Sequence, residues 1–329
     1  MDLSDNVISH YSLDPSVARN LSHSTITAPT MEAITPRWFL TFLPWVSVEA
    51  GVYRVNQVKR RNDDSAMEVM ENPEILPRVI ADNLKERELP ETFTDYEGVP
   101  REYILSVIKT LLKMNTHITD IFNSPLDQKE QEMRLTIEAM KERQEWEMIN
   151  NENYGLLHSV SPRMKVRSRY GIPMPDDMDE LLARVWKKPS FFLAHPRAIA
   201  AFGRECTRRG VPPVTMNIFG TPFMTWRGVP ILPCDKLLID GKTCNMSSAG
   251  KTNILLMRVG EREQGVVGLH QPGIPDEGII PSLSIKYAGI DNRGIATYIL
   301  SLYFGTAVLS DDSLGMLENV EVGYYYDYT

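Results

Sequence analysis

Residues 127–150, DQKEQEMRLTIEAMKERQEWEMIN, carry the clearest helical pattern in this 329-residue sequence. One stripe of the segment consists of Met133, Ile137, Met140 and Met148, with Gln144 completing it. Residues three and four positions apart lie on one face of a helix. The other faces carry charged residues, so the sequence predicts a long helix with one buried stripe and one solvated side. Such a stripe is typical of a packed core rather than of a cofactor site.

Two further helices are predicted downstream. Residues 175–190 begin with Asp176 and Asp177, whose carboxylates can accept hydrogen bonds from the open amides of a first helical turn. This acidic pair therefore needs no catalytic explanation. Residues 195–210 end at Gly210, a residue type that commonly closes helices, and the arginines before it complement the helix dipole.

The rest of the chain divides between two more predicted helices and a series of strands. Residues 101–125 carry apolar residues at helical spacing, and residues 294–305 form a short apolar segment, so we expect a helix in each. The strand-like runs are 215–220, 222–233, 252–259, 264–272, 306–310 and 318–328. Long helices mixed with largely antiparallel strands predict an α+β fold rather than alternating βαβ units.

The N-terminal region combines a polar arm with an aromatic cluster. Its first 35 residues show little periodicity and predict an extended or disordered segment. The aromatic residues that follow are Trp38, Phe39, Phe42 and Trp45. They either fold back on the chain's own core or dock on a neighbouring subunit, because large apolar groups on an arm usually mark an interface. We take the four as candidate intersubunit arm contacts.

A long hairpin is predicted after the arm. Residues 52–60 alternate like a strand, and strand character returns within residues 92–105. About thirty residues rich in charge and in helix formers lie between these two segments. A projecting hairpin cannot bury both of its faces alone, so we expect it to lie across a partner.

The charge balance argues against nucleic-acid binding. The formal net charge is −8, whereas nucleic-acid-binding proteins usually carry a basic balance or a strong basic patch. One extended segment does place four basic residues on one face: Arg163, Lys165, Arg167 and Arg169. Nucleic-acid contact is possible there, but in this acidic chain we interpret the face as solvated or intersubunit.

The cysteines and the apolar stretches indicate a cytoplasmic protein. Cys206, Cys234 and Cys244 are scattered and form no C-x-x-C pair, so packed thiols in a reducing compartment are expected rather than disulfides or a zinc site. The N-terminus lacks the basic start and apolar stretch of a signal peptide. No apolar stretch reaches the ~20 residues that span a bilayer.

Residues 245–252, NMSSAGKT, come within one glycine of a phosphate-binding P-loop, with Asn245 where the loop requires Gly. A P-loop also needs a buried strand before the turn and a helix after it. Here the preceding residues are polar, and the following NILLMRV is strand-sized. We interpret the segment as a loop before a strand, with a nucleotide-binding enzyme that uses Lys251 as an alternative.

Other catalytic signatures are missing from the sequence. It has no G-x-S-x-G, H-E-x-x-H or G-x-G-x-x-G pattern, and its six histidines are dispersed. We therefore expect no catalytic, cofactor-binding or metal residues, and a role in assembly or binding rather than catalysis.

The sequence resembles the family 2A encapsulin shell proteins, the subgroup of a cyanobacterial sulfur-regulated shell protein and the mycobacterial major membrane protein I. Five stretches carry the resemblance: TPRWFLTFLPWVSVEAGVYRVNQV (35–58), TFTDYEGVPREYIL (92–105), MRLTIEAMKERQE (133–145), KKPSFFLAHPRAIAAFGRECTRRGVPP (187–213) and FMTWRGVPILPCDKL (223–237). It extends from about Ile34 to Glu321, which is nearly the whole chain.

This resemblance implies the Hong Kong 97-type fold of tailed-phage capsid proteins, with the predicted helix 127–150 as the long spine helix. The implied layout is an N-terminal arm (1–47), an extended loop or E-loop (48–100), a peripheral domain (101–170 and 285–329) and an axial domain (171–284). No additional cyclic-nucleotide-binding domain interrupts the axial region.

The implied function is structural. The resemblance implies a homo-oligomeric icosahedral shell (T=1, about 60 subunits) with closed point-group symmetry. It also implies an encapsulated cysteine desulfurase held by its disordered N-terminal segment, a role in sulfur metabolism, and no nucleic-acid or membrane partner. Small molecules would pass through pores at the symmetry axes. The candidate fivefold rim is Thr207, Arg208, Arg209, Gly210, Val211 and Pro212. Arginines there would attract small anions or zwitterions, or they merely cap the helix and pair with neighbours.

The same fold also suits a phage or prophage major capsid protein that packages nucleic acid, and we keep this as the alternative. The acidic net charge argues against it, as does the lack of an acidic, helical, scaffold-like N-terminal region.

Overall fold

The computed structural model describes residues 35–49, 51–56, 100–115, 128–240, 250–272 and 282–323. The expected polar arm, the charged excursion of the hairpin and most of the P-loop-like segment lie outside these residues. The chain divides into two compact units, Met1–Glu49 with Leu105–Thr329, and Ala50–Ile104, and each is described by itself.

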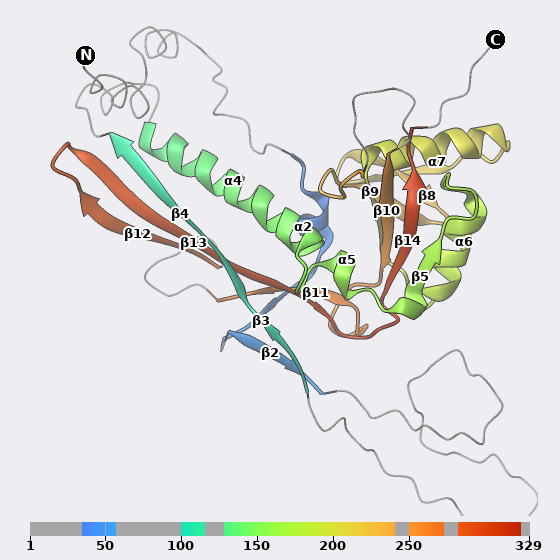
Figure 1. Ribbon diagram of the computed structural model, residues 1–329, viewed down its shortest axis with the longest axis horizontal. Helices are drawn as coiled ribbons and strands as arrows, with labels where there is room; N and C mark the ends of the chain where they lie inside the picture. Colours follow the sequence, from blue (N-terminus) through green and yellow to red (C-terminus); the bar gives the residue numbers. More distant parts are fainter. Residues whose placement is uncertain are drawn as a thin grey trace, which may run out of the picture. The chain divides into compact units, whose positions relative to one another are not determined.

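The first unit contains a five-stranded sheet built on the long strand β13 (Ile295–Val308) (Figure 1). Along one edge of β13 runs β4 (Ser106–Asn115), and the other edge is shared by β12 (Leu283–Ile290) and β11 (Val266–His270), all antiparallel to β13. The short strand β1 (Trp45–Ser47) then adds to β11 in parallel. The pairing of β4 with β13 continues without a register shift over the whole of β4.

The long helix α4 (Gln128–Asn150) lies along β4 and β13 (Figure 1). Its Met140 side chain is buried in a cluster with Leu283, Leu300 and Leu302 of the sheet, and Ile137 packs against that cluster. The predicted helix is therefore confirmed. Of its stripe, Met140, Gln144 and Met148 are buried, whereas Met133 and Ile137 are partly buried. Two acids of the helix, Glu138 and Glu145, are also buried, which the sequence pattern did not predict.

A seven-stranded sheet forms the other part of this unit, on the right of Figure 1. In spatial order its strands are β5 (Lys165–Arg167), β14 (Leu314–Glu321), β10 (Lys251–Met257), β6 (Phe191–Ala194), β9 (Val229–Pro233), β8 (Thr221–Trp226) and β7 (Val214–Ile218). The strand-like runs predicted within residues 215–272 are confirmed in these strands and in β11.

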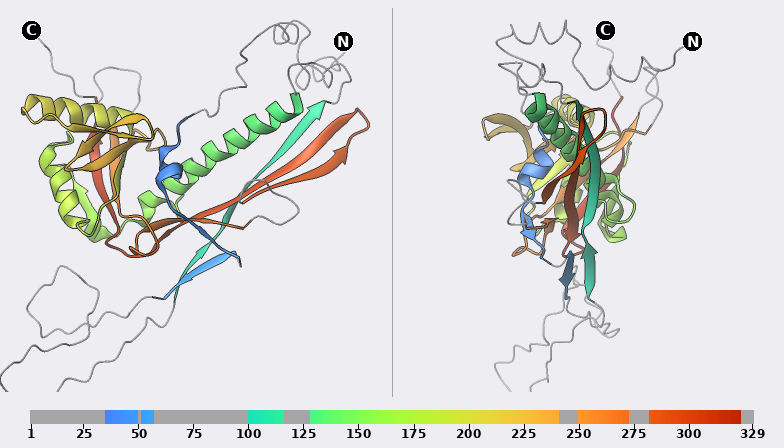
Figure 2. Two further views of the ribbon diagram at one scale, coloured as in Figure 1. Left: turned by 180° about the vertical axis from the view of Figure 1, so that it is seen from behind. Right: turned by 90° about the vertical axis from the view of Figure 1, so that its left-hand side faces the viewer.

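Two helices pack on the seven-stranded sheet: α6 (Pro175–Arg184) on β14 and β5, and α7 (Pro196–Arg208) on β14 and β9 (Figure 2). The close approach of α6 requires a glycine in β14. At Gly315 a Cβ would lie 2.8 Å from Leu181 Cδ1 and 2.9 Å from Val185 Cγ2. Larger side chains at this position would push helix and sheet apart.

The end of α7 follows its predicted chemistry, whereas the start of α6 differs from the prediction, because its N-cap residue is Met174 and makes no side-chain cap hydrogen bond. Asp177 is fully buried and accepts a hydrogen bond from Ser168 Oγ at 3.2 Å. Burial raises the pKa of Asp177. His195 caps α7 by accepting from Arg197 N at 3.1 Å, and Gly210 follows the helix with φ of 71°. The short helices of this unit are α2 (Trp38–Phe42), α5 (Leu156–Ser159) and η3 (Pro162–Met164).

The second unit contains a two-stranded antiparallel ribbon of β2 (Val52–Val55) and β3 (Arg101–Ile104). Arg54 Nε lies 2.8 Å from Glu102 Oε1 across the ribbon. The predicted return of the chain as a strand that pairs with residues 52–55 is confirmed.

The helix predicted over residues 101–125 is wrong, because the described residues there form β3 and β4. β4 is apolar on both faces: Ile108 and Leu112 pack against the cluster under α4, whereas Val107 and Leu111 are exposed. Neighbouring apolar residues on the two faces of a strand reproduce helical spacings of three and four. Residues 106–115 form a strand because they pair with β13.

The helix predicted over residues 294–305 is also wrong, because this segment belongs to β13. The strand is buried on both faces over much of its length, including Leu300, Ser301 and Leu302. A continuous apolar run of this kind does not distinguish a buried strand from a buried helix. Its β-branched and aromatic residues fit the strand.

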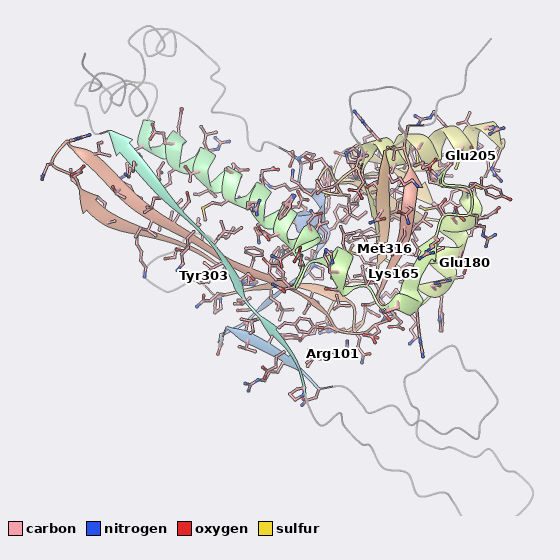
Figure 3. All side chains as sticks on the ribbon, viewed as in Figure 1. Arg101, Lys165, Glu180, Glu205, Tyr303 and Met316 are labelled. Carbon is pink, nitrogen blue, oxygen red and sulfur yellow. The ribbon has the colours of Figure 1, made fainter. Side chains whose placement is uncertain are left out.

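The two sheets cross the segment boundaries expected from the sequence. β5 and β14 come from segments expected in the peripheral domain, yet they join the seven-stranded sheet, where Lys165 pairs with Met316 (Figure 3). β11 lies within residues 171–284, yet it joins the five-stranded sheet. Among the described residues, no helix is long and apolar enough to cross a membrane.

A buried ion-pair network links β10 to the segment before β14. Arg258, 3% exposed, donates from Nη2 to Asp312 Oδ1 at 2.7 Å, and Lys187 Nζ lies 3.1 Å from Asp312 Oδ2. Ser310 Oγ donates to the same carboxylate. Burial raises the pKa of Asp312, but the hydrogen bonds from Arg258, Ser310 and Lys187 outweigh it and lower this pKa to about 2.

Replacing Met140 by Asp should prevent folding, since the change buries an unpaired charge between α4 and the sheet. Leu135→Asp is the matched control, because Leu135 lies on the same helix and is 47% exposed. We expect Met140→Asp to be insoluble or to lose cooperative thermal unfolding, with Leu135→Asp close to the parent. Equal melting curves for the two variants would contradict this packing.

Replacing Asp312 by Asn should destabilise the protein most at neutral pH. A carboxyl whose folded pKa is lowered contributes stability above its unfolded pKa of about 3.9, and that stability is lost as the pH falls toward the folded value. We expect a loss of about 2 kcal/mol near neutral pH that shrinks below about pH 4. Denaturant unfolding across this pH range tests it, with the exposed Glu152→Gln as control. A loss independent of pH would contradict the ionic role.

Candidate functional site

The aromatic residues of the arm pack on the chain's own core. Phe39 is fully buried, and the ring of Trp38 meets Phe223 edge to face with centroids 5.0 Å apart. Phe42 meets Phe191 at 5.8 Å and Phe219 at 5.5 Å in the same way. Of the two explanations left open by the sequence, folding back is thus observed for these three residues. Contact between the exposed edges of Trp38 and Phe42 and a neighbouring subunit stays a prediction.

Trp45 anchors the end of the arm in the five-stranded sheet. It lies in β1 opposite Gly268 of β11, where a Cβ would meet Trp45 Cε3 at 2.7 Å. Its indole Nε1 donates to the Leu40 carbonyl oxygen at 3.1 Å. The glycine is therefore needed for the ring to lie flat against the strand, and the ring holds α2 to β1.

Charged residues hold the arm against α4. Arg37 Nη1 lies 2.6 Å from Glu138 Oε2 and 3.3 Å from Glu142 Oε1. Thr35 donates to Glu142 Oε1 from both its amide and its hydroxyl, and Lys236 Nζ lies 2.7 Å from Glu142 Oε2. Burial raises the pKa of Glu142, but the hydrogen bonds from Lys236 and Thr35 outweigh it and hold this pKa below its usual value. One turn further along the helix, burial raises the pKa of Glu145 to about 7.

A cavity of about 450 Å³ lies between the arm, α4 and the five-stranded sheet. Its lining combines apolar side chains such as Leu40, Trp45 and Leu302 with Arg37 and Lys141. The arm therefore forms one wall of the cavity, and a shift of the arm would change the shape of the cavity.

The candidate rim residues form an exposed segment at the end of α7. All six positions from Thr207 to Pro212 are exposed. Arg209 Nε donates to Glu205 Oε1 at 2.8 Å, and Glu205 (labelled in Figure 3) is 3% exposed. The pairing of Arg209 within the chain agrees with the alternative that these arginines bind their neighbours. The six rim residues lie at the end of α7, whereas the arm aromatics lie in α2 and β1.

The exposed surface continues from the rim onto β7, which is the last strand of the seven-stranded sheet. Val214 is 72% exposed, Met216 is 44% exposed, and Phe219 in the turn after β7 is 74% exposed. An edge strand with exposed apolar side chains presents both backbone groups and apolar surface for pairing with another chain. Sequence reasoning identified the strand but not its edge position, which depends on sheet order.

A second exposed apolar surface lies on the face of the five-stranded sheet away from α4. Leu111 of β4 and Ile299 of β13 are directly opposite each other, 61% and 36% exposed, and Val107 is 42% exposed. Three exposed lysines flank this surface: Lys109 and Lys113 of β4, and Lys286 of β12, which pairs with Ile299. This basic and aliphatic face contrasts with the acidic balance of the whole chain.

The P-loop interpretation is excluded by the element that follows it. Residue 251 begins β10, which pairs with β14 and β6, where a P-loop requires a helix. Lys251 Nζ lies 3.6 Å from Glu321 Oε1 on the neighbouring strand. A Cβ at Gly250 would meet Ile239 Cγ2 at 2.3 Å, so packing accounts for this glycine. Residues 241–249 lie outside the described residues.

The fold places the chain among the Hong Kong 97-type capsid and shell proteins. The structure is similar to the capsid protein of a native GTA particle (TM-score 0.58, 12% identity, 93% of this chain and 99% of that chain). It is also similar to that of Microbacterium phage Oxtober96 (TM-score 0.56, 10% identity, 93% and 99%). At these identities the likeness defines the fold alone.

The sequence then defines the family within that class. The family profile described as "Type 2A encapsulin shell protein SrpI-like" matches residues 62–324. The chain is 51% identical over 311 residues to the type 2A encapsulin shell protein SrpI of Synechococcus elongatus, covering 94% of each chain. It is 48% identical over 312 residues to the type 2A encapsulin shell protein of Mycobacterium leprae, covering 94% of this chain and 95% of the relative.

A solved structure supports the same assignment. The cryoEM structure of the holo-SrpI encapsulin complex from Synechococcus elongatus matches with a TM-score of 0.77 and 48% identity, covering 97% of this chain and 99% of that chain. The chain belongs to the SrpI-like type 2A encapsulin shell protein family.

Proposed function

We propose that this chain is a non-catalytic subunit that self-assembles in the cytoplasm into a closed icosahedral shell (T=1, about 60 subunits) around a cargo enzyme. The cargo is a cysteine desulfurase held by its disordered N-terminal segment, which gives the shell a role in sulfur metabolism. The observation that carries the proposal is the 48% identity to a chain of a holo-encapsulin complex over nearly the full length of both chains.

The two exposed apolar surfaces support assembly. The edge of β7 offers backbone groups, and the face of β4 and β13 offers aliphatic side chains between lysines. Monomeric soluble proteins rarely expose contiguous apolar patches of large area, so such surfaces favour contacts between subunits.

The rim residues are proposed to line a pore at the fivefold axes. Arg208 and Arg209 occur once per subunit, so five copies around an axis would form a basic ring that attracts small anions or zwitterions such as cysteine. The ion pair of Arg209 with Glu205 reduces the net positive charge of that ring. Of the four arm aromatics, intersubunit contact is proposed only for the exposed edges of Trp38, Phe42 and Trp45, because Phe39 is fully buried.

A phage or prophage capsid that packages nucleic acid is the second candidate, and the fold likeness to phage and GTA capsids favours it. The net charge of −8 and the much higher identity to shell proteins favour the encapsulin role.

The full chain expressed alone should form closed particles, seen by size exclusion and negative stain, without nucleic acid after nuclease treatment. Deleting residues 1–45 should abolish assembly, but this deletion also removes the buried Phe39 and can prevent folding. Arg37→Ala is therefore the sharper variant, because it removes the ion pairs of the arm with Glu138 and Glu142 and leaves Phe39 in place.

Arg54→Ala is the matched control, because its ion pair with Glu102 is exposed and such pairs contribute little. We expect fewer or irregular particles from Arg37→Ala and normal particles from Arg54→Ala. A full chain that remains a monomer or dimer would contradict the shell, and protected nucleic acid inside particles would support the capsid alternative.

The cargo class is tested by co-expression with a cysteine desulfurase from the same organism, with and without its N-terminal extension. We expect the complete enzyme to elute with the particles and the shortened enzyme to elute separately. Equal retention of both forms, or of neither, would contradict the proposed cargo or its mode of attachment.

A further inference from the structure

Three metal-ligating side chains from two separate segments meet beside the charged residues that hold the arm. Glu145 belongs to α4, and Cys234 and Asp235 directly follow β9. One ligand atom of each lies within 4.8 Å of the others, and Cys234 Sγ is 3.9 Å from Glu145 Oε1. The sequence predicted no metal site, because its cysteines and histidines lack the spacing of a known motif, whereas here the donors are brought together by the fold.

This cluster of side chains is unusual because two of its three members are buried. Glu145 is 2% exposed and Cys234 is 3% exposed. Within the part of the chain that the structure describes, the only hydrogen-bond partner of the Glu145 carboxylate is the Cys234 thiol, a weak donor at this distance. A buried carboxylate without a strong donor or a cation is costly, so this group points to a ligand.

The charged groups around these three residues are compatible with a bound cation. Four carboxylates and three basic groups lie in this region: Glu138, Glu142, Glu145, Asp235, Arg37, Lys141 and Lys236. Lys236 Nζ is 2.8 Å from Asp235 and 2.7 Å from Glu142, so it can keep Glu142 as its partner if Asp235 turns toward a metal. The side chain of Asp235 is 50% exposed, which provides a path for an ion from solvent.

We infer that Glu145, Cys234 and Asp235 bind a thiophilic divalent cation, with Zn²⁺ the best match to one thiolate and two carboxylates. Zn–S distances of about 2.3 Å and Zn–O distances of about 2.0–2.2 Å place the donors of a tetrahedral site about 3.5 Å apart. Small side-chain rotations bring the three residues to that spacing, with water as the fourth ligand. On binding, the Cys234 thiol transfers its proton to solvent and its sulfur bonds the metal, with no change of oxidation state.

Such an ion would join the C-terminal part of α4 to the residues after β9, next to the contacts of Arg37 and Thr35 that hold the arm. Binding to the folded protein alone stabilises it according to the ratio of free metal to Kd. The site is independent of the cargo proposal, because it depends only on contacts within one chain.

The test is Zn²⁺ binding by the untagged full chain, measured by equilibrium dialysis and by the shift in Tm. We expect one Zn²⁺ per chain and a raised Tm. Cys234→Ser, Glu145→Gln and Asp235→Asn should each raise Kd at least tenfold. Cys206→Ser is the matched control, since Cys206 is also buried but lies outside the cluster, and it should bind as the parent does.

If the variants at the buried positions fail to fold, Asp235→Asn still tests the site, because the side chain of Asp235 is half exposed. Spectroscopy with Cd²⁺, whose thiolate complexes absorb in the ultraviolet, identifies the sulfur ligand directly. No saturable binding by the parent chain, or unchanged binding by Asp235→Asn together with a sulfur-free Cd²⁺ spectrum, would overturn the site.

Discussion

The pairing of β4 with β13 is the interaction on which the rest of the first unit depends. It joins residues 106–115 to residues 295–304 in one continuous register and so creates the surface under α4. Ile108, Leu112 and Leu300 then face Met140, and each buried side chain of this size contributes about 1.5–3 kcal/mol. Most of the stability of an amphipathic helix in a protein comes from the packing of its apolar face, and neither strand can bury its apolar face without the others.

The described part of the arm, residues 35–47, packs into the fold of its own subunit. Its aromatic rings complete the core of the seven-stranded sheet, and Arg37 and Thr35 bind Glu138 and Glu142 of α4. Subunit contacts therefore have to use what this packing leaves exposed. The edge of β7 and the outer face of β4 and β13 are two such surfaces, and they differ in kind, because the first offers backbone hydrogen bonds and the second offers side chains.

The sequence was most informative where local chemistry determines structure. The stripe of α4, the glycine that closes α7 and the strand-sized run after Lys251 all lead to the observed elements. It failed for β4 and β13, because strands with apolar residues on both faces mimic helical spacing and only their mutual pairing resolves it. The buried acids Glu138 and Glu145 were missed for a related reason: their partners come from the arm and from the segment after β9, which no local pattern reveals.

The fold of the subunit does not determine what a particle contains. Chains of about 10–12% identity share this architecture and come from phage and GTA capsids, so the contents of a particle do not follow from the packing of α4 on its sheet. What a particle contains must therefore depend on features other than this packing, such as the side chains at exposed surfaces. The exposed segment at the end of α7 and the edge strand β7 take no part in the β4–β13 pairing, so substitutions there can leave this scaffold intact.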